Sequence, residues 1–247
     1  MKYLKLCLLL LLTSVLLSGC HTASLPLTDA SQPAAPAAVG ASSEADASQA
    51  AETIAAPEAP GPISEETIAR LNSEYFNLDG SAGMRNMLLT SVYDDVRAID
   101  LYRLFYNGIP ETQNNVSEEE RALLSALDAG AAHLDITKVT TAQMDAVLQT
   151  YAGLGLDQTE RRSLDQLIYL DQYDAYYLIH GDCIDARCEV LSGTRTEDGY
   201  LILQYRFPYW MDGDCYDLTL RETETELLFV SNVPADRAAA SPSDAPT

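Results

Sequence analysis

Hydrophobic positions recur at helical spacing through the first half of a segment that runs from residue 63 to residue 233. Apolar side chains three or four residues apart lie on one face of a helix, so this spacing predicts amphipathic helices. Ser64 is a capping residue for the first helix, Ser117 and Thr140 open capping boxes before two others, and Gly153 is placed to end the last of these. The predicted apolar faces carry Ile68, Leu71 and Tyr75; Leu123, Leu124 and Leu127; Met144, Val147, Leu148 and Tyr151; and, in a shorter helix, Leu164, Leu167 and Ile168.

The second half of this segment changes to the short, alternating apolar runs that are typical of strands. Turn-forming residues separate most of them, among them Glu197-Asp198-Gly199 and Asp212-Gly213-Asp214. Successive strands with short connections favour an antiparallel meander. We therefore expect an α+β domain at residues 63–233, with N-terminal helices packed on a C-terminal antiparallel β-meander. The predicted strands are Tyr173 to His180, Cys188 to Thr194, Tyr200 to Phe207, Cys215 to Arg221 and Leu227 to Ser231.

Composition sets the two ends of the chain apart from this domain. Of the 42 residues from 21 to 62, 25 are Ala, Pro or Ser and none is aromatic. Such a stretch has too little apolar surface to offset the entropy lost on ordering. Residues 20–62 are therefore predicted to be a disordered tether, and residues 234–247, which have a similar composition, a disordered tail.

The N-terminus has the pattern of an export signal. Basic residues Lys2 and Lys5 precede an apolar run from Leu6 to Leu17, and the small residues Ser18 and Gly19 precede Cys20. Leu-Ser-Gly-Cys resembles the lipobox of bacterial lipoproteins. The resemblance implies that residues 1–19 are a signal peptide, that Cys20 is lipidated, and that two or three acyl chains such as palmitate anchor the chain to the outer face of the bacterial cytoplasmic membrane.

Three stretches of the domain carry a second resemblance. They are Leu-Tyr-Arg-Leu-Phe-Tyr-Asn-Gly at 101–108, Tyr-Asp-Ala-Tyr-Tyr-Leu-Ile-His-Gly-Asp at 173–182 and Phe-Val-Ser-Asn-Val-Pro at 229–234. In these stretches the domain is similar to uncharacterised lipoproteins of Gram-positive gut bacteria. The resemblance implies an extracytoplasmic location and a fold, but no activity.

The chain is strongly acidic, with a net charge of −22 over 247 residues. Loss of Lys2 and Lys5 with the signal leaves 13 basic and 37 acidic side chains, a net charge of −24. This charge repels nucleic acid, which we exclude as a partner, and favours basic partners.

Three cysteines, Cys183, Cys188 and Cys215, remain beside the lipidated Cys20. Outside the cytoplasm, disulfides persist, so one structural disulfide among the three is the first expectation. Three free, buried thiols are the second. A zinc site formed by the three thiolates and His180 is the third, although the spacing of Cys183 and Cys188 is unlike that of a zinc knuckle.

Other candidate sites each have a structural interpretation beside the functional one. His180-Gly181-Asp182 lies at a predicted strand end, where a catalytic histidine could be presented, but a structural or pH-responsive role is favoured. The stretch from Asp212 to Asp217 has alternating carboxylates around a glycine, as in calcium loops, but is favoured as a hairpin turn. Aromatic residues that could bind a sugar ring are more often core residues; they are Phe207, Tyr209, Trp210, Tyr173, Tyr176 and Tyr177, of which alternation places Tyr173 and Tyr177 on one face and Tyr176 on the other.

No P-loop, His-Glu-x-x-His zinc motif or Gly-x-Gly-x-x-Gly turn occurs, and the sequence nominates no catalytic residue, metal or cofactor. The favoured interpretation is a lipid-anchored, extracytoplasmic lipoprotein with a non-enzymatic binding or interaction domain. Its partners would be the membrane, through the lipid on Cys20, and an envelope protein or a cell-wall fragment. The alternative is an extracytoplasmic hydrolase acting on cell-wall peptide or glycan, with acidic residues or His180 at its active site.

Overall fold

A computed structural model describes residues 59–78, 80, 83–110, 115–209 and 214–235, all of which belong to one compact unit. The expected signal peptide, Cys20, most of the expected tether and nearly all of the expected tail lie outside the described residues. Gly61–Pro62, at the end of the expected tether, pair with a strand of the domain, and Pro234 ends the last strand.

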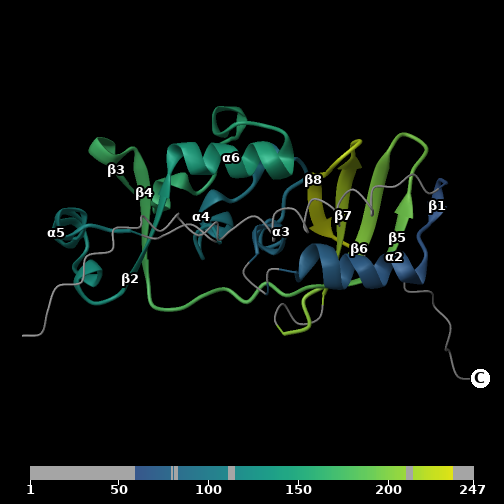
Figure 1. Ribbon diagram of the computed structural model, residues 1–247, viewed down its shortest axis with the longest axis horizontal. Helices are drawn as coiled ribbons and strands as arrows, with labels where there is room; N and C mark the ends of the chain where they lie inside the picture. The colour runs from purple at the N-terminus through teal and green to yellow at the C-terminus, as the bar shows by residue number, and fades with distance from the viewer. Residues whose placement is uncertain (1–58, 79, 81–82, 111–114, 210–213, 236–247) are drawn as a thin grey trace, which may run out of the picture. The chain divides into compact units, whose positions relative to one another are not determined.

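The domain combines helices with antiparallel sheets, as the sequence predicts (Figure 1). Its α-helices are α2 (Glu65–Arg70), α3 (Met84–Met87), α4 (Leu101–Leu104), α5 (Glu118–Leu127) and α6 (Thr141–Ala152). Its strands are β1 (Gly61–Pro62), β2 (Asp135–Thr140), β3 (Ile168–Leu170), β4 (Ala175–His180), β5 (Glu189–Arg195), β6 (Tyr200–Arg206), β7 (Cys215–Glu222) and β8 (Leu227–Pro234). A π-helical segment at Leu71–Phe76 and 3-10 turns at Val96–Ala98, Ala129–Ala132, Leu156–Gln158, Leu164–Gln166 and Asp171–Tyr173 complete the described elements.

The predicted meander is formed by β5, β6, β7 and β8, which pair antiparallel in chain order, with β1 added beyond β5. Pairs such as Leu201–Leu220 and Leu203–Leu218 lie on the buried face of this five-stranded sheet. On that face α2 contacts β5 (Figure 1).

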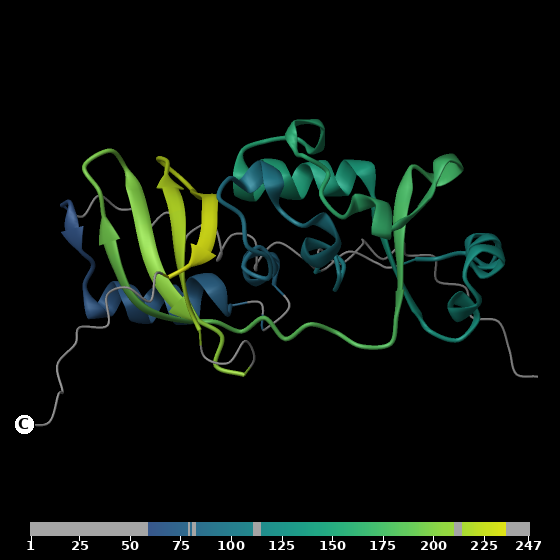
Figure 2. The ribbon, with the colours of Figure 1, turned by 180° about the vertical axis from the view of Figure 1, so that it is seen from behind.

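The prediction that the strand ending at His180 begins the meander is wrong. β4 lies in a separate three-stranded sheet, in the order β2-β4-β3. The sequence analysis predicted neither β2 nor β3, the two strands that pair with β4. The β-branched residues Ile136 and Val139 of β2 are nevertheless typical of a strand. Figures 1 and 2 show α3, α4 and α6 between the two sheets.

Both predicted capping boxes are confirmed. The hydroxyl of Ser117 accepts from the N–H of Glu120, and the Glu120 side chain accepts from the N–H of Ser117. Thr140 and Gln143 form the same reciprocal pair of bonds. Ser64 caps α2 through a single bond, accepting from the N–H of Thr67 at 3.2 Å. Gly153 ends α6 in the left-handed conformation, with φ of 67°.

Two predicted apolar faces are wrong in part. In α5, Leu124 is buried, but Leu123 and Leu127 are 36% and 65% exposed, because the buried positions are Leu124 and Glu120, one turn apart. The short helix expected at Leu164 is a single 3-10 turn, and Ile168 begins β3 instead. The run Ile-Tyr-Leu has strong strand propensity and pairs with β4.

Glu120 is the most buried carboxylate in the described chain, at 2% exposure. It forms an ion pair with Lys138 of β2 and accepts hydrogen bonds from the hydroxyl of Tyr177 at 2.5 Å and the N–H of Ser117 at 2.7 Å. Burial raises the pKa of the Glu120 carboxyl, but the bonds from Lys138, Tyr177 and Ser117 outweigh burial and lower the pKa to about 2. The network ties α5 to the three-stranded sheet.

One continuous core joins the two sheets. It includes Val139 and Leu178 from the three-stranded sheet, Leu203 and Phe229 from the five-stranded sheet, and Leu148 from α6. A smaller cluster lies under α5. The elements are therefore packed as parts of one domain.

Candidate binding site

Residues 181–188, the connecting segment, run from β4 of one sheet to β5 of the other (green, Figures 1 and 2). They form neither helix nor strand. From Asp185 onward their burial nevertheless alternates, since Ala186 and Cys188 are buried while Asp185 and Arg187 are more exposed. A period of two is typical of extended backbone, so the connecting segment lies as a strand would.

Asparagine side chains take the place of a neighbouring strand along this segment. The Oδ1 of Asn107 accepts from the N–H of Ile184 at 2.9 Å, and its Nδ2 donates to the Ile184 carbonyl at 2.8 Å. Asn77 makes the same pair of bonds with Cys188, at 3.4 Å and 3.0 Å. Each amide thus satisfies both backbone groups of one residue, as the backbone of a paired strand does.

The series continues at alternate residues. Asn72 accepts from the N–H of Val190 at 2.8 Å and donates to its carbonyl at 3.0 Å. Asn86 donates to the carbonyl of Ala186 at 2.9 Å, while its own Oδ1 is buried and accepts no hydrogen bond from the described residues. Residues 184, 186, 188 and 190 are therefore held from one side by four asparagines, which together we call the asparagine ladder.

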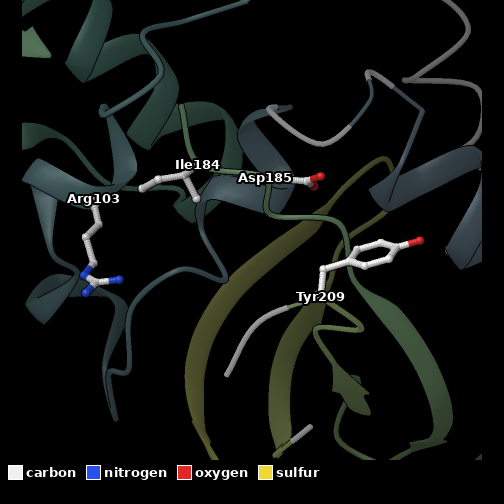
Figure 3. A pocket seen from close by; sticks show the side chains of 4 residues that line it. All are labelled: Arg103, Ile184, Asp185 and Tyr209. Carbon is white, nitrogen blue, oxygen red and sulfur yellow. The ribbon is translucent and has the colours of Figure 1, made fainter. Parts of the chain in front are cut away.

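An open cavity of about 330 Å³ lies beside the connecting segment. Its lining residues are Arg103 of α4, Ile184 and Asp185 of the segment, and Tyr209, which follows β6. Figure 3 shows these four side chains, with Arg103 and Tyr209 well apart and the two segment residues between them. The volume is at the lower end of the range for ligand sites.

The cavity presents both charges and an aromatic ring. Tyr209 is 71% exposed, and the guanidinium of Arg187 lies 4.9 Å from its ring centroid. Asp185 accepts three hydrogen bonds from Arg187, from its backbone N–H at 3.2 Å, its Nε at 3.1 Å and its Nη2 at 2.5 Å. Arg103 donates to the carbonyl of Thr90 at 3.2 Å. This combination suits a ligand with polar backbone groups and some apolar surface.

His180 has hydrogen-bond partners on both ring nitrogens. Its Nδ1 lies 2.5 Å from the carbonyl oxygen of Asp182, which can only accept, so Nδ1 carries the hydrogen. Nε2 is then free to accept from the hydroxyl of Thr137 at 2.9 Å. Thr137 is only 9% exposed, so this hydroxyl is screened from a substrate.

Tyr106 completes the surroundings of His180. Its ring centroid lies 4.7 Å from that of the imidazole, and its hydroxyl donates to the Asp182 carboxylate at 2.5 Å. This bond to the carboxylate, with a smaller contribution from burial, raises the pKa of Tyr106 to about 12. The cluster therefore ties the start of the connecting segment to the end of α4.

No family model matches the chain, and no curated protein or solved structure matches it either. The likeness to bacterial lipoproteins stays a prediction from the sequence. Among the described residues, no helix has both the length and the apolar character required to cross a membrane.

The three cysteines of the domain are free thiols. Cys215 pairs in register with Arg206, and Arg206 with Glu189, so β6 separates Cys215 from Cys188. Two strand spacings are about 9.6 Å, beyond the Cα separation of about 7 Å that a disulfide tolerates. A bond between Cys188 and Cys215 would therefore not join neighbouring strands.

The zinc site does not assemble. Within the described ranges no three His, Cys, Asp or Glu side chains are grouped so that they could hold a metal ion. His180 is occupied by Thr137 and Asp182, and Cys188 faces the core at 5% exposure.

The two cysteines near the cavity are expected to differ sharply in reactivity. Cys183 is exposed, whereas burial raises the pKa of the Cys188 thiol to about 12. Because the thiolate is the nucleophile, iodoacetamide should alkylate Cys188 at least about a hundredfold more slowly than Cys183. Peptide mass spectrometry of the native full-length chain measures both rates, and denatured chain, in which the rates should converge, is the control. Equal native rates would contradict the burial of Cys188.

The expected aromatic platform is divided between core and surface. Phe207 is buried at 1% exposure, while Tyr209 lines the cavity. Trp210, Asp212 and Gly213 lie outside the described residues, so the calcium-loop interpretation stays untested. Tyr176 and Tyr177 are adjacent in β4, where Tyr177 approaches Lys138 and Tyr176 packs on Tyr169. Tyr173 lies in the 3-10 turn before β4 and not in the strand, although its ring also approaches Lys138.

Sequence reasoning missed the residues that build the site. It nominated His180 and the cysteines, but not Arg103, Asp185 or Asn107. The alternation of apolar and polar residues from Ile184 to Val190 was the one available signal for an extended segment. Nothing local marks the asparagines as its partners.

Proposed function

We propose that the chain is a lipid-anchored, extracytoplasmic lipoprotein whose domain binds a partner without catalysis. The observation that carries this proposal is the cavity at Arg103, Ile184, Asp185 and Tyr209, placed against a connecting segment whose backbone is held by the asparagine ladder. A binding surface on fixed backbone loses little conformational entropy when a partner docks.

The anchoring part of the proposal rests on the N-terminal sequence. A basic start, an apolar run and Leu-Ser-Gly-Cys support lipidation at Cys20. The net charge of −24 that remains after loss of Lys2 and Lys5 would keep the domain away from anionic lipid and leave its surface open to basic partners. An envelope protein or a cell-wall fragment outside the cytoplasmic membrane would bind at the cavity.

A hydrolase acting on cell-wall peptide or glycan is the second candidate. The hydrogen bond between Thr137 and Nε2 of His180 has the geometry of a hydroxyl activated by a base, and it is the observation in favour. The burial of Thr137 weighs against it, since the hydroxyl would have to reach a substrate.

A thermal-shift experiment tests the binding proposal. Full-length protein in detergent is melted with soluble peptidoglycan fragments, short glycans and lysine-rich peptides. A ligand at a hundred times its Kd stabilises the native state by about 2.7 kcal/mol, which raises Tm by a few degrees. We expect at least one of these ligands to raise Tm, and Tyr209→Ala to remove that shift, because Tyr209 supplies the exposed ring of the cavity.

Tyr169→Ala is the matched control, since Tyr169 is another exposed tyrosine, 42% exposed on β3. A shift that persists in Tyr209→Ala would contradict the assignment of the site. Cleavage of a wall fragment that is lost in His180→Gln would favour the hydrolase instead.

A further inference from the structure

Arg103 is a cation of the cavity that no described carboxylate neutralises. Its Nη1 donates to the carbonyl of Thr90 at 3.2 Å, and no described residue forms a hydrogen bond or an ion pair with its Nε or Nη2. The other cation beside the cavity, Arg187, forms an ion pair with Asp185. The four described lining residues and Arg187 together therefore carry one net positive charge, opposite in sign to the net charge of −22 of the whole chain.

The unoccupied side of the Arg103 guanidinium has the geometry that binds a carboxylate. Nε and Nη2 present two parallel N–H donors, which match the two oxygens of one carboxylate. Arg187 binds the Asp185 carboxylate through this same pair of nitrogens. Arg97 binds Asp95 in the same way. In Arg103 the bond from Nη1 to a backbone carbonyl positions the guanidinium and leaves Nε and Nη2 to a ligand.

Ile184 and Tyr209 supply apolar surface beside this cation. Figure 3 shows Ile184 and Asp185 between Arg103 and the ring of Tyr209. The side chain of Tyr209 is 71% exposed, so its ring is open to a ligand. A ligand whose carboxylate lies at Arg103 would therefore extend over Ile184 toward this ring, and a cavity of about 330 Å³ limits it to a small molecule or the end of a chain.

We infer that the cavity binds the free carboxylate end of a short peptide, with the carboxylate on Arg103 and the adjoining side chains on Ile184 and Tyr209. The inference rests on the proposed binding function and names the class of ligand. A peptide end combines a carboxylate, polar backbone groups and apolar side chains in a small volume. The acidic chain repels anions at a distance, but at physiological ionic strength this repulsion is screened beyond about 8 Å, whereas Arg103 acts at contact.

Affinity selection with two peptide pools tests the inference on the full-length protein in detergent. Both pools contain acetylated tripeptides of randomised sequence, and one ends in a free carboxylate while the other ends in a carboxamide. The net charge of the chain favours the carboxamide pool, so a preference for the carboxylate pool requires a local cation. We expect the carboxylate pool to bind at least about tenfold more tightly, and Arg103→Gln to abolish the preference.

Arg162→Gln is the matched control. Arg162 is also exposed and donates to a backbone carbonyl through Nη1, but it is not among the described residues that line the cavity. Its replacement removes the same charge and should leave the preference intact. Arg103→Lys keeps the charge without the paired donors and should retain only part of the preference. Equal loss of the preference in Arg103→Gln and Arg162→Gln would overturn the assignment to Arg103.

The pool comparison on the wild-type protein does not depend on the folding of any variant, and it separates this inference from the proposed function. Equal retention of both pools, lost in Tyr209→Ala, would overturn carboxylate recognition but leave the cavity as a binding site. Retention of neither pool would overturn the inference alone if glycans or wall fragments still raise Tm, and both proposals if nothing does. Within the carboxylate pool, a preference for terminal D-residues would identify a cell-wall peptide as the source, and a preference for L-residues the end of a protein.

Discussion

Replacing Glu120 with alanine is expected to lower the free energy of unfolding by about 3–5 kcal/mol. The carboxylate is 2% exposed and has Lys138, Tyr177 and Ser117 as partners. Its removal leaves a largely buried ammonium and a fully buried tyrosine hydroxyl without their acceptor. Urea unfolding of the full-length protein, followed by circular dichroism, measures the loss.

Glu119→Ala is the matched control, because Glu119 lies in the same first turn of α5 and is exposed. It should change the free energy of unfolding by less than about 0.5 kcal/mol. A small effect of Glu120→Ala, equal to that of the control, would contradict the buried ion pair.

The same network makes the free energy of unfolding fall as the pH is lowered, because the pKa of Glu120 is lower in the folded chain. The folded pKa of Glu120 is about 2, below the value of about 4.3 in an unfolded chain. Its contribution is therefore present above pH 4.3 and lost as the pH falls through 2. The difference in stability between wild type and Glu120→Ala should accordingly shrink over this window.

Loss of Asn77 is expected to cost about 2–3 kcal/mol, the second large effect. Asn77 is the centre of the asparagine ladder, since it bonds both backbone groups of Cys188, donates to the carbonyl of Asn72 at 2.8 Å and accepts from Asn86 at 3.0 Å. Cys188 is buried, so its backbone groups would find no water in place of the amide.

Two further substitutions test whether Asn77→Ala destabilises the protein through lost hydrogen bonds or through lost side-chain volume. Asn77→Asp keeps the size but removes both donors, and should destabilise about as much as Asn77→Ala. Gln166→Ala removes an exposed amide elsewhere and should have little effect. Chemical unfolding of the three variants measures their free energies of unfolding. Full stability in Asn77→Asp would show that the ladder does not hold the connecting segment.

Local signals in the sequence predicted much of the fold. Capping boxes at Ser117 and Thr140 and the glycine at 153 are recognisable because each satisfies backbone groups a few residues away. The meander was predictable for a similar reason, since its strands alternate and pair with their neighbours in the chain.

Long-range pairing was not predictable. β4 follows directly on β3 and could equally have begun the meander, and only its pairing with β2, over 30 residues earlier, places it in the other sheet. Likewise the asparagine ladder draws on three separate segments of the chain, at Asn72 and Asn77, at Asn86 and at Asn107. No spacing relates Asn72 to Val190 or Asn107 to Ile184, because three-dimensional packing alone brings them together.

Amide hydrogen exchange along the connecting segment, measured by NMR on the full-length protein in detergent micelles, tests the central claim most directly. That claim is an extended segment whose alternate residues are held by the asparagine ladder. Ile184 and Cys188, whose N–H groups bond to Asn107 and Asn77, should exchange slowly, and Cys183 between β4 and the ladder should exchange fast. Exchange at Ile184 and Cys188 as fast as at Cys183 would contradict the ladder.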